Sequence, residues 1–137
     1  MQYTYTKEDV EQIAFCDWLQ IQKNKGKVIE YFAIQNENKM SWAVKNKAHL
    51  FAITAKQKKM GKKRGVSDIC VILKNKVLFV EMKRKAKQLK TKQSKAGINI
   101  SKEQLEFLET IKKSDIADGK IAFGAKEAIE FVKMYIT

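Results

Sequence analysis

Three residues at the ends of two neighbouring apolar segments have side chains suited to metal-assisted chemistry. Asp68 opens the segment Asp68 to Leu73, and Glu81 and Lys83 end the segment Val77 to Lys83. Alternate residues of a β-strand share a face, so Glu81 and Lys83 point to the same side. A carboxylate and an ammonium ending an otherwise apolar strand are costly unless that end opens into a functional cleft. We therefore expect these groups to converge at one edge of a sheet.

This set of side chains suits the hydrolysis of phosphodiesters. Carboxylates bind a hard cation such as Mg²⁺ or Mn²⁺, which polarises the scissile phosphate and lowers the pKa of a bound water. The lysine can orient or deprotonate the attacking water, or it can stabilise charge on the phosphorane. The sequence predicts a metal-dependent site with Asp68 and Glu81 as its carboxylates.

The register of the hairpin between the two segments decides whether Asp68 joins the other two residues. Facing residues in a regular hairpin have a constant sum of residue numbers, and 68 plus 81 is odd. Asp68 therefore shares the face of Glu81 only if the loop has an even number of residues, such as Asn75-Lys76 closing a Lys74–Val77 pair. A three-residue loop would turn Asp68 to the opposite face.

The elements that must position these residues follow from the patterns of apolar and capping residues. Thr6 and Ser101 are N-cap residues followed by acidic or amide side chains, which predicts two helix starts. Residues 39–55 are ambiguous, because their apolar residues fit a helix only irregularly. The order α-β-(α)-β-β-α-β-α indicates an α/β protein with a mixed sheet flanked by helices, in one domain over 1–137. The other expected elements are a strand from Val28 to Ile34, a strand from Lys120 to Phe123 and a helix from Lys126 to Tyr135.

The charge of the chain favours a polyanionic partner. There are 28 Lys and Arg residues against 15 Asp and Glu, which gives a formal net charge of +13. Each phosphate that such a surface neutralises releases a condensed counterion, so nucleic acid is the expected partner. Two basic stretches, 56–65 and 84–95, flank the proposed site in sequence and would contact the DNA backbone without reading bases. The alternative is that both stretches are no more than solvated loops. The expected contacts are Lys58, Lys59, Lys62, Lys63, Arg64, Arg84, Lys85 and Lys87.

The same motifs carry a resemblance to a known family. The pattern Gly-Val-Ser-Asp at 65–68, twelve intervening residues, Glu-Met-Lys-Arg at 81–84 and Ser-Lys-Glu-Gln-Leu at 101–105 resembles the virus-type replication-repair nuclease (VRR-NUC) domain. This family belongs to the PD-(D/E)XK superfamily, and the resemblance implies a restriction-endonuclease-like α-β-β-β-α-β core. It extends from the first helix to Phe123. One departure is Ser67, where the family usually has proline.

The resemblance also implies roles for individual residues. Asp68 and Glu81 would be metal ligands, joined by the Met82 carbonyl, and Lys83 would be the catalytic lysine. Gln104 would position a water or a substrate phosphate, and Glu11 in the first helix would be an acidic residue of the metal site. The implied activity is a structure-selective DNA endonuclease of DNA repair, dependent on Mg²⁺ or Mn²⁺, acting on branched or Holliday-type junctions as a homodimer.

Simpler explanations exist for each of these residues. Asp68 could satisfy backbone amides at a strand start, and Glu81 and Lys83 could form a solvent-facing ion pair on an edge strand. Gln104 and Glu11 are also side chains that the first turn of a helix favours. At the level of the whole chain, the alternatives are a non-catalytic basic DNA-binding module and a protein whose lysines meet an acidic partner.

Other classes of protein fit less well. His49 is the only histidine, which argues against histidine-dependent nucleases such as the HNH type. Cys16 and Cys70 lie in apolar segments without a CxxC pair, so we expect reduced thiols rather than a zinc site or disulfides. The N-terminus has no signal-peptide pattern, and no apolar run approaches the roughly 20 residues that span a membrane. We expect an intracellular protein, cytoplasmic or nucleoid-associated, that is not secreted.

Overall fold

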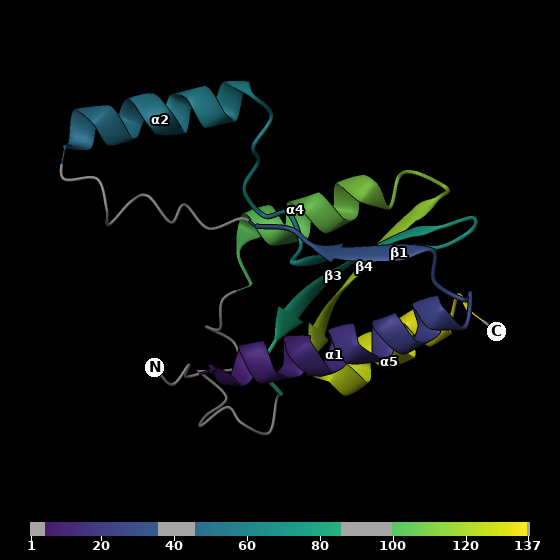
Figure 1. Cartoon of the computed structure of the whole chain (residues 1–137). Coiled ribbons are helices and arrows are strands. Elements are labelled where there is room, and N and C mark those ends of the chain that lie inside the picture. Colours follow the sequence, from purple (N-terminus) through teal and green to yellow (C-terminus); the bar gives the residue numbers. More distant parts are fainter. Residues whose placement is uncertain (1–4, 36–45, 86–99, 137) are drawn as a thin grey trace.

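Four strands form one mixed sheet in the computed structural model, which describes residues 5–35, 46–85 and 100–136 (Figure 1). The order in the sheet is β1-β2-β3-β4. β1 pairs with β2 and β2 with β3 in antiparallel fashion, whereas β3 and β4 are parallel. The predicted α/β class with a mixed sheet is confirmed. The strands are β1 (Glu30–Ala33), β2 (Ile69–Ile72), β3 (Val77–Lys83) and β4 (Ala117–Phe123).

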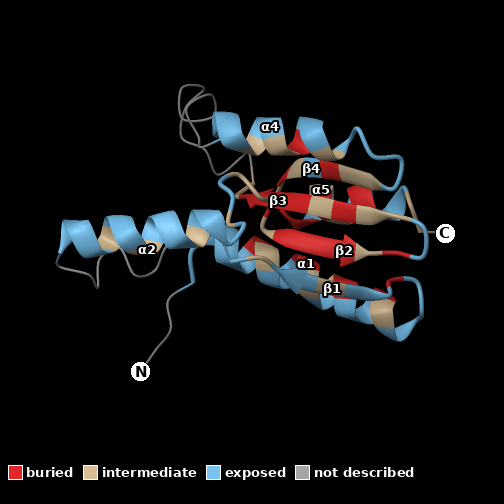
Figure 2. Cartoon of the chain, turned by 90° about the horizontal axis from the view of Figure 1, so that it is seen from above, coloured by how far each residue is buried: buried red, intermediate tan, exposed pale blue. Residues whose placement is uncertain are grey.

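Helices cover both faces of this sheet. Figure 1 shows α1 (Lys7–Asn24) and α5 (Ala125–Lys133) side by side on one face, with α4 (Lys102–Ile111) on the other. The main core lies between the sheet and the α1–α5 pair, where Phe15 and Val132 pack with Val80 of β3. The burial colours of Figure 2 follow this arrangement, because the inner strands β2 and β3 are mostly red, whereas the edge strand β1 is mostly exposed.

The predicted element order is confirmed, with shifts at the ends. β1 is shorter than the predicted 28–34, and β4 begins at Ala117 rather than Lys120. β4 is longer because all seven of its residues pair with β3, from Ala117 opposite Val77 to Phe123 opposite Lys83. The two predicted N-caps are confirmed: Thr6 forms a capping box with Asp9, and Ser101 forms one with Gln104.

The helix α2 (Lys47–Lys59) extends into the region expected to be a basic loop. Its N-cap is Asn46, whose side chain accepts from the amide of Ala48 at 2.9 Å. Its last turn holds Lys56 and Lys58, and cations there complement the negative end of the helix dipole. α2 buries none of its residues and projects beyond the sheet (Figure 2), which accounts for its irregular apolar pattern. The predicted helix-lining residues Trp42 and Val44 lie outside the described residues.

The hairpin between β2 and β3 has the even loop that the parity argument requires. Leu73 donates to the carbonyl of Lys76 at 2.8 Å, so the loop is Lys74-Asn75, one residue earlier than the example predicted from sequence. Ile69 faces Val80, so the next pair outward is Asp68 and Glu81.

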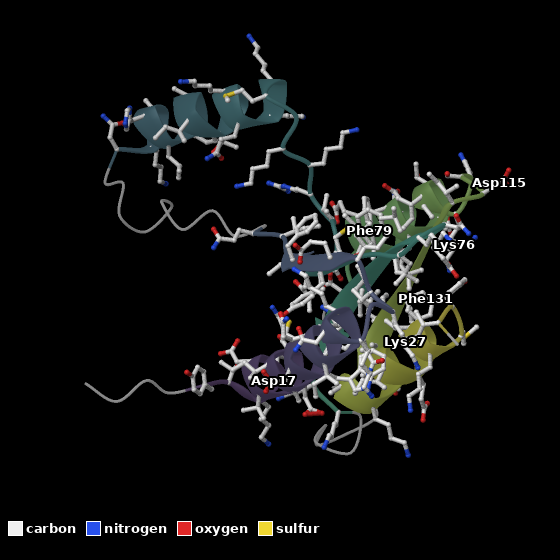
Figure 3. All side chains as sticks on the ribbon, turned by 45° about the vertical axis from the view of Figure 1, so that its right-hand side comes forward. Asp17, Lys27, Lys76, Phe79, Asp115 and Phe131 are labelled. Carbon is white, nitrogen blue, oxygen red and sulfur yellow. The ribbon has the colours of Figure 1, made fainter. Side chains whose placement is uncertain are left out.

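The tip of the hairpin is anchored to the start of β4. The Nζ of Lys76 donates to the carbonyl oxygen of Asp115 at 2.6 Å, and Figure 3 shows these two residues next to each other. The same ammonium lies 5.7 Å from the ring centroid of Tyr135 beyond α5, and the Tyr135 hydroxyl donates to Asp118 of β4. These contacts hold the loop whose length sets the register.

The two cysteines of the chain form no disulfide with each other. Cys16 and Cys70 are free thiols, and burial raises the pKa of both. Within the described ranges, no helix is long and apolar enough to cross a membrane.

Gly65 holds the basic loop against α4. Its φ is +83°, and a Cβ at this position would lie 2.3 Å from the carbonyl carbon of Glu103. We expect Gly65→Ala to lower the free energy of unfolding by more than about 2 kcal/mol, because the substitution adds a clash with backbone to an unfavourable φ. Gly61→Ala is the matched control, since Gly61 has φ +97° but open space around it. It should cost only about 1 kcal/mol in urea denaturation. Equal losses would show that Gly65 makes no tight contact.

Candidate active site

The site lies at the carboxyl end of β3, on the face of the sheet that α4 covers. Phe79 marks this face, because its ring meets Phe107 of α4 edge-on with centroids 5.3 Å apart. Glu81 and Lys83 follow Phe79 at alternate positions and therefore share its face. Both side chains are buried, with Glu81 5% and Lys83 6% exposed.

Asp68 completes a pair of carboxylates with Glu81. It stands opposite Glu81 in the hairpin register, directly before β2. Its Oδ2 accepts a hydrogen bond from the backbone amide of Met82 at 2.8 Å. One strand therefore fixes both acids, since β3 carries Glu81 and holds Asp68 through its own backbone.

Gln104 connects this pair to α4. Its Nε2 donates to Oε1 of Glu81 at 2.7 Å, while its own Oε1 accepts from the backbone amide of Ser101 at 3.0 Å. The simple explanation therefore holds, because Gln104 completes the cap of α4, and this cap directs its amide at Glu81. Its predicted role in positioning a water or a substrate phosphate stays a prediction.

The two carboxyl groups strongly affect each other's ionisation. Burial and the Asp68 carboxylate raise the pKa of Glu81 to about 8, although the ammonium of Lys83, 3.6 Å from Glu81 Oε1, opposes the shift. Burial also raises the pKa of Asp68, against the opposing effects of the Met82 amide and Lys83. Oε2 of Glu81 is buried and has no hydrogen-bond partner among the described residues. An unpartnered buried carboxylate oxygen is unfavourable, so this site has unused capacity to bind a cation.

The first helix contributes two acids with different surroundings. The charge of Glu8 adds to the rise in the pKa of both Asp68 and Glu81. Glu11, which the sequence assigned to the metal site, is buried and turned toward α5: its Oε1 accepts from the amide of Ala125 at 3.4 Å and lies 3.5 Å from the Lys85 ammonium. Sequence reasoning passed over Glu8, although it lies one turn before Glu11 on the same helix face.

Glu11 acts as a cap for α5. The N-cap of α5 is Gly124, which has no side chain to provide an acceptor of its own, and Glu11 supplies the acceptor from another helix. The amide of Gly124 donates to the carbonyl of Lys83 at 2.9 Å, so this cap lies directly beside the end of β3.

The beginnings of α4 and α5 therefore both meet the site end of β3. The first turn of α4 contacts Glu81 through Gln104, and the residue before α5 bonds to the Lys83 carbonyl. Helix N-termini carry partial positive charge and unpaired amides, which favour anions such as phosphate groups.

An exposed ion pair on an edge strand does not describe Glu81 and Lys83. β3 has β2 on one side and β4 on the other, so it is an inner strand. Both side chains are also buried. Burying an acid and a lysine costs free energy, which makes a purely structural pair a poor explanation for them.

A divalent cation fits the donor set. Within the described part of the chain, no group of three or more His, Cys, Asp or Glu side chains lies close enough together to hold a metal ion. Glu11 stays a predicted ligand, and in this structure it is engaged by the amide of Ala125. Mg²⁺ is commonly held by one or two carboxylates, with waters and substrate phosphates completing its octahedron. Asp68 and Glu81 meet that requirement, and the Met82 carbonyl remains a predicted further ligand.

The predicted DNA contacts lie in two places. The first place is the end of α2 and the loop after it. One cavity beside α4 is lined there by Lys58, Lys62, Lys63 and Arg64, and Lys59 is exposed on the last turn of α2. The second place is the end of β3. Arg84 and Lys85 follow β3 directly and are half-buried. Lys87 lies outside the described residues.

Substitutions at Gln104 can separate its two contacts. Gln104→Glu keeps an acceptor for Ser101 but loses the donor to Glu81, whereas Gln104→Ala loses both. We expect each variant to lower metal affinity or cleavage by about 10- to 100-fold. Gln104→Ala should also lower stability by about 1 kcal/mol, because the cap is lost. Gln104→Glu keeps the cap, but its carboxylate would lie beside Glu81 and should lower stability through repulsion, mainly in the metal-free protein. If Gln104→Glu binds metal and cleaves like the wild type, Gln104 is only a cap.

Comparisons of the chain with protein-family models, with curated proteins and with solved structures found no match.

Proposed function

We propose that this protein is a metal-dependent DNA endonuclease with a restriction-endonuclease-like core. The observation that carries the proposal is the pair formed by half-buried Asp68 and buried Glu81, in which Glu81 Oε2 has no partner among the described residues while Lys83 lies beside it. Two adjacent carboxylates that are largely shielded from water repel each other and would also repel DNA, unless a cation lies between them. A protein that only binds DNA gains nothing from such a pair.

The residues of the site would have different roles in phosphodiester hydrolysis. When bound, Mg²⁺ or Mn²⁺ supplies Lewis acidity toward the scissile phosphate and lowers the pKa of a water ligand. Asp68, anchored by the Met82 amide, and Glu81, oriented by Gln104, would hold the ion. Lys83 presents a positive charge on the same face, where it can orient the attacking water or stabilise charge on the phosphorane.

The substrate in this proposal is branched DNA, such as a Holliday-type junction, and the active form is a homodimer. The net charge of +13 supports a nucleic-acid substrate. Symmetric cutting of two strands needs two sites, which a twofold dimer provides. Sedimentation of the protein alone and with junction DNA measures this state, and a monomer on the junction would remove the dimer from the proposal.

The test is cleavage of a labelled four-way junction and of a matched linear duplex, with Mg²⁺, with Mn²⁺ and with EDTA. We expect cutting with either metal, none with EDTA, and a preference for the junction. If the protein binds the junction but cuts neither DNA with either metal, the enzymatic proposal fails and a basic DNA-binding module takes its place. If binding is insensitive to salt, an acidic protein partner becomes the better explanation.

A further inference from the structure

A cavity of about 780 Å³ lies between α2, the loop that follows it and the first turn of α4. Gln57 and Lys58 line it from α2, and Glu103 lines it from α4. The loop between them contributes three cations, Lys62, Lys63 and Arg64. A cavity of this size is large enough for a nucleotide unit.

The cavity is positively charged without local compensation. No carboxylate of the described residues lies within ion-pair distance of its four cationic side chains, and Lys62 Nζ instead donates weakly to Gln57 Oε1 at 3.5 Å. Glu103 is the one acid in its lining. Four converging cations against one carboxylate select an anion, and phosphate is the anion that Lys and Arg bind best in such clusters.

The cavity and the carboxylate pair share a wall. Glu103 faces the cavity, while the next residue, Gln104, donates to Glu81. Gly65 lies directly on this first turn, because an added Cβ would stand 2.7 Å from the Gln104 amide nitrogen. A DNA strand that enters the site can therefore place a neighbouring phosphate in the cavity.

We infer that this basic cavity, lined by Lys58, Lys62, Lys63 and Arg64, binds a phosphate group of the DNA strand that is cut. This inference rests on the proposed function and adds to it a second point of contact, apart from the metal site. The phosphate is either an internal phosphodiester or a terminal phosphate, since both present the same oxygens.

The test measures DNA binding in EDTA, so that it does not depend on cleavage. The variant is the triple substitution Lys58→Ala, Lys62→Ala and Lys63→Ala in the full chain. Its control is Lys25→Ala, Lys27→Ala and Lys133→Ala, which removes the same charge from a second basic cavity elsewhere on the protein. The probe is a fluorescently labelled DNA strand, prepared with and without a 5′-phosphate, and its affinity is read by anisotropy at several salt concentrations.

We expect the first triple variant to lose at least about tenfold in affinity and to lower the salt slope by about 0.7 for each phosphate that it no longer neutralises. The control should lose less than about threefold. Loss of a preference for the 5′-phosphate identifies a terminal phosphate, and equal losses for both strands identify an internal one. Equal losses in the two triple variants overturn the inference, because they would report only net charge.

A second substitution should change DNA affinity in the opposite direction. A gain in affinity cannot result from misfolding. Glu103→Gln removes the one carboxylate that the described residues contribute to the cavity and should tighten binding by roughly threefold or more. Glu109→Gln, an exposed acid further along α4, removes the same charge outside the cavity and should have a smaller effect. Equal effects would contradict the inference. If the wild-type protein cuts no DNA, the nuclease proposal is wrong. The inference that the basic cavity binds a phosphate is still tested by the DNA affinities.

Discussion

Lys83→Ala is expected to reduce DNA cleavage by about 10²- to 10⁴-fold, while DNA binding in EDTA changes little. The lysine lies on the same face of β3 as Glu81, with its Nζ 3.6 Å from Glu81 Oε1, and it is buried, so water cannot replace its charge. A positioned general acid–base group or a charge stabiliser contributes a factor of this size to catalysis. The measurement is single-turnover cleavage of the four-way junction with saturating Mg²⁺.

The matched control for this variant is Lys120→Ala. Lys120 lies on the neighbouring strand β4 and is exposed, so its removal takes the same charge from the sheet without touching the site. It should cleave at nearly the wild-type rate. A Lys83→Ala protein that cleaves as fast as this control would exclude Lys83 from the chemistry.

Glu81→Gln is expected to abolish metal-dependent cleavage and, at the same time, to stabilise the metal-free protein at alkaline pH. Glutamine keeps an acceptor for Gln104 but removes the charge that repels Asp68. Cleavage should fall by at least about 10³-fold, because under the proposed function one of the two carboxylates that would hold the metal is lost. A variant that is inactive and yet more stable cannot be inactive through misfolding.

The pH dependence of this effect follows from the pKa of Glu81. The pKa is about 8 in the folded protein against an ordinary value of 4.5, so the folded state holds a proton that the unfolded chain has released. The free energy of unfolding of the wild type should therefore fall as pH rises from about 4.5 to 8, by on the order of 3 kcal/mol. Glu81→Gln should lose most of this fall, and added Mg²⁺ should reverse it in the wild type alone.

Thermal unfolding at pH 5, 6.5 and 8 in EDTA measures this dependence. Glu109→Gln is the control, because Glu109 is an exposed acid on α4, beyond the first turn that contacts Glu81. If the wild type and Glu81→Gln show parallel pH profiles, the carboxylates of Asp68 and Glu81 do not share the buried environment described above.

Local chemistry made the helix starts and the residues of β3 predictable from the sequence. Thr6 and Ser101 cap helices through contacts three residues away, which sequence spacing displays directly. The even loop of the hairpin followed from requiring Asp68 and Glu81 on one face. Its exact position did not, because Lys74-Asn75-Lys76 contains no glycine to distinguish one two-residue turn from the next.

Contacts between distant segments limited the rest of the prediction. Glu8 and Glu11 lie on the same side of α1, and only the packing of α5 shows that Glu11 is engaged by Ala125. The extent of α2 was hidden for a related reason: it buries none of its residues, so no apolar stripe marks it. The basic cavity likewise depends on the contact of Gly65 with α4, and no local sequence pattern predicts that contact.

We expect the two-residue turn between β2 and β3 to form before the rest of the site during folding. Short hairpins close within microseconds, whereas pairing across an intervening helix, as between β3 and β4, is slower. Asp68 and Glu81 would then meet while water still surrounds them, and they would lose that water when α4 docks and Gln104 reaches Glu81. The repulsion between Asp68 and Glu81 would therefore become strong only when α4 docks, after the hairpin has formed. Under the proposed function, a divalent cation captured by the hairpin would speed this docking step, so the ion would serve folding before it serves catalysis.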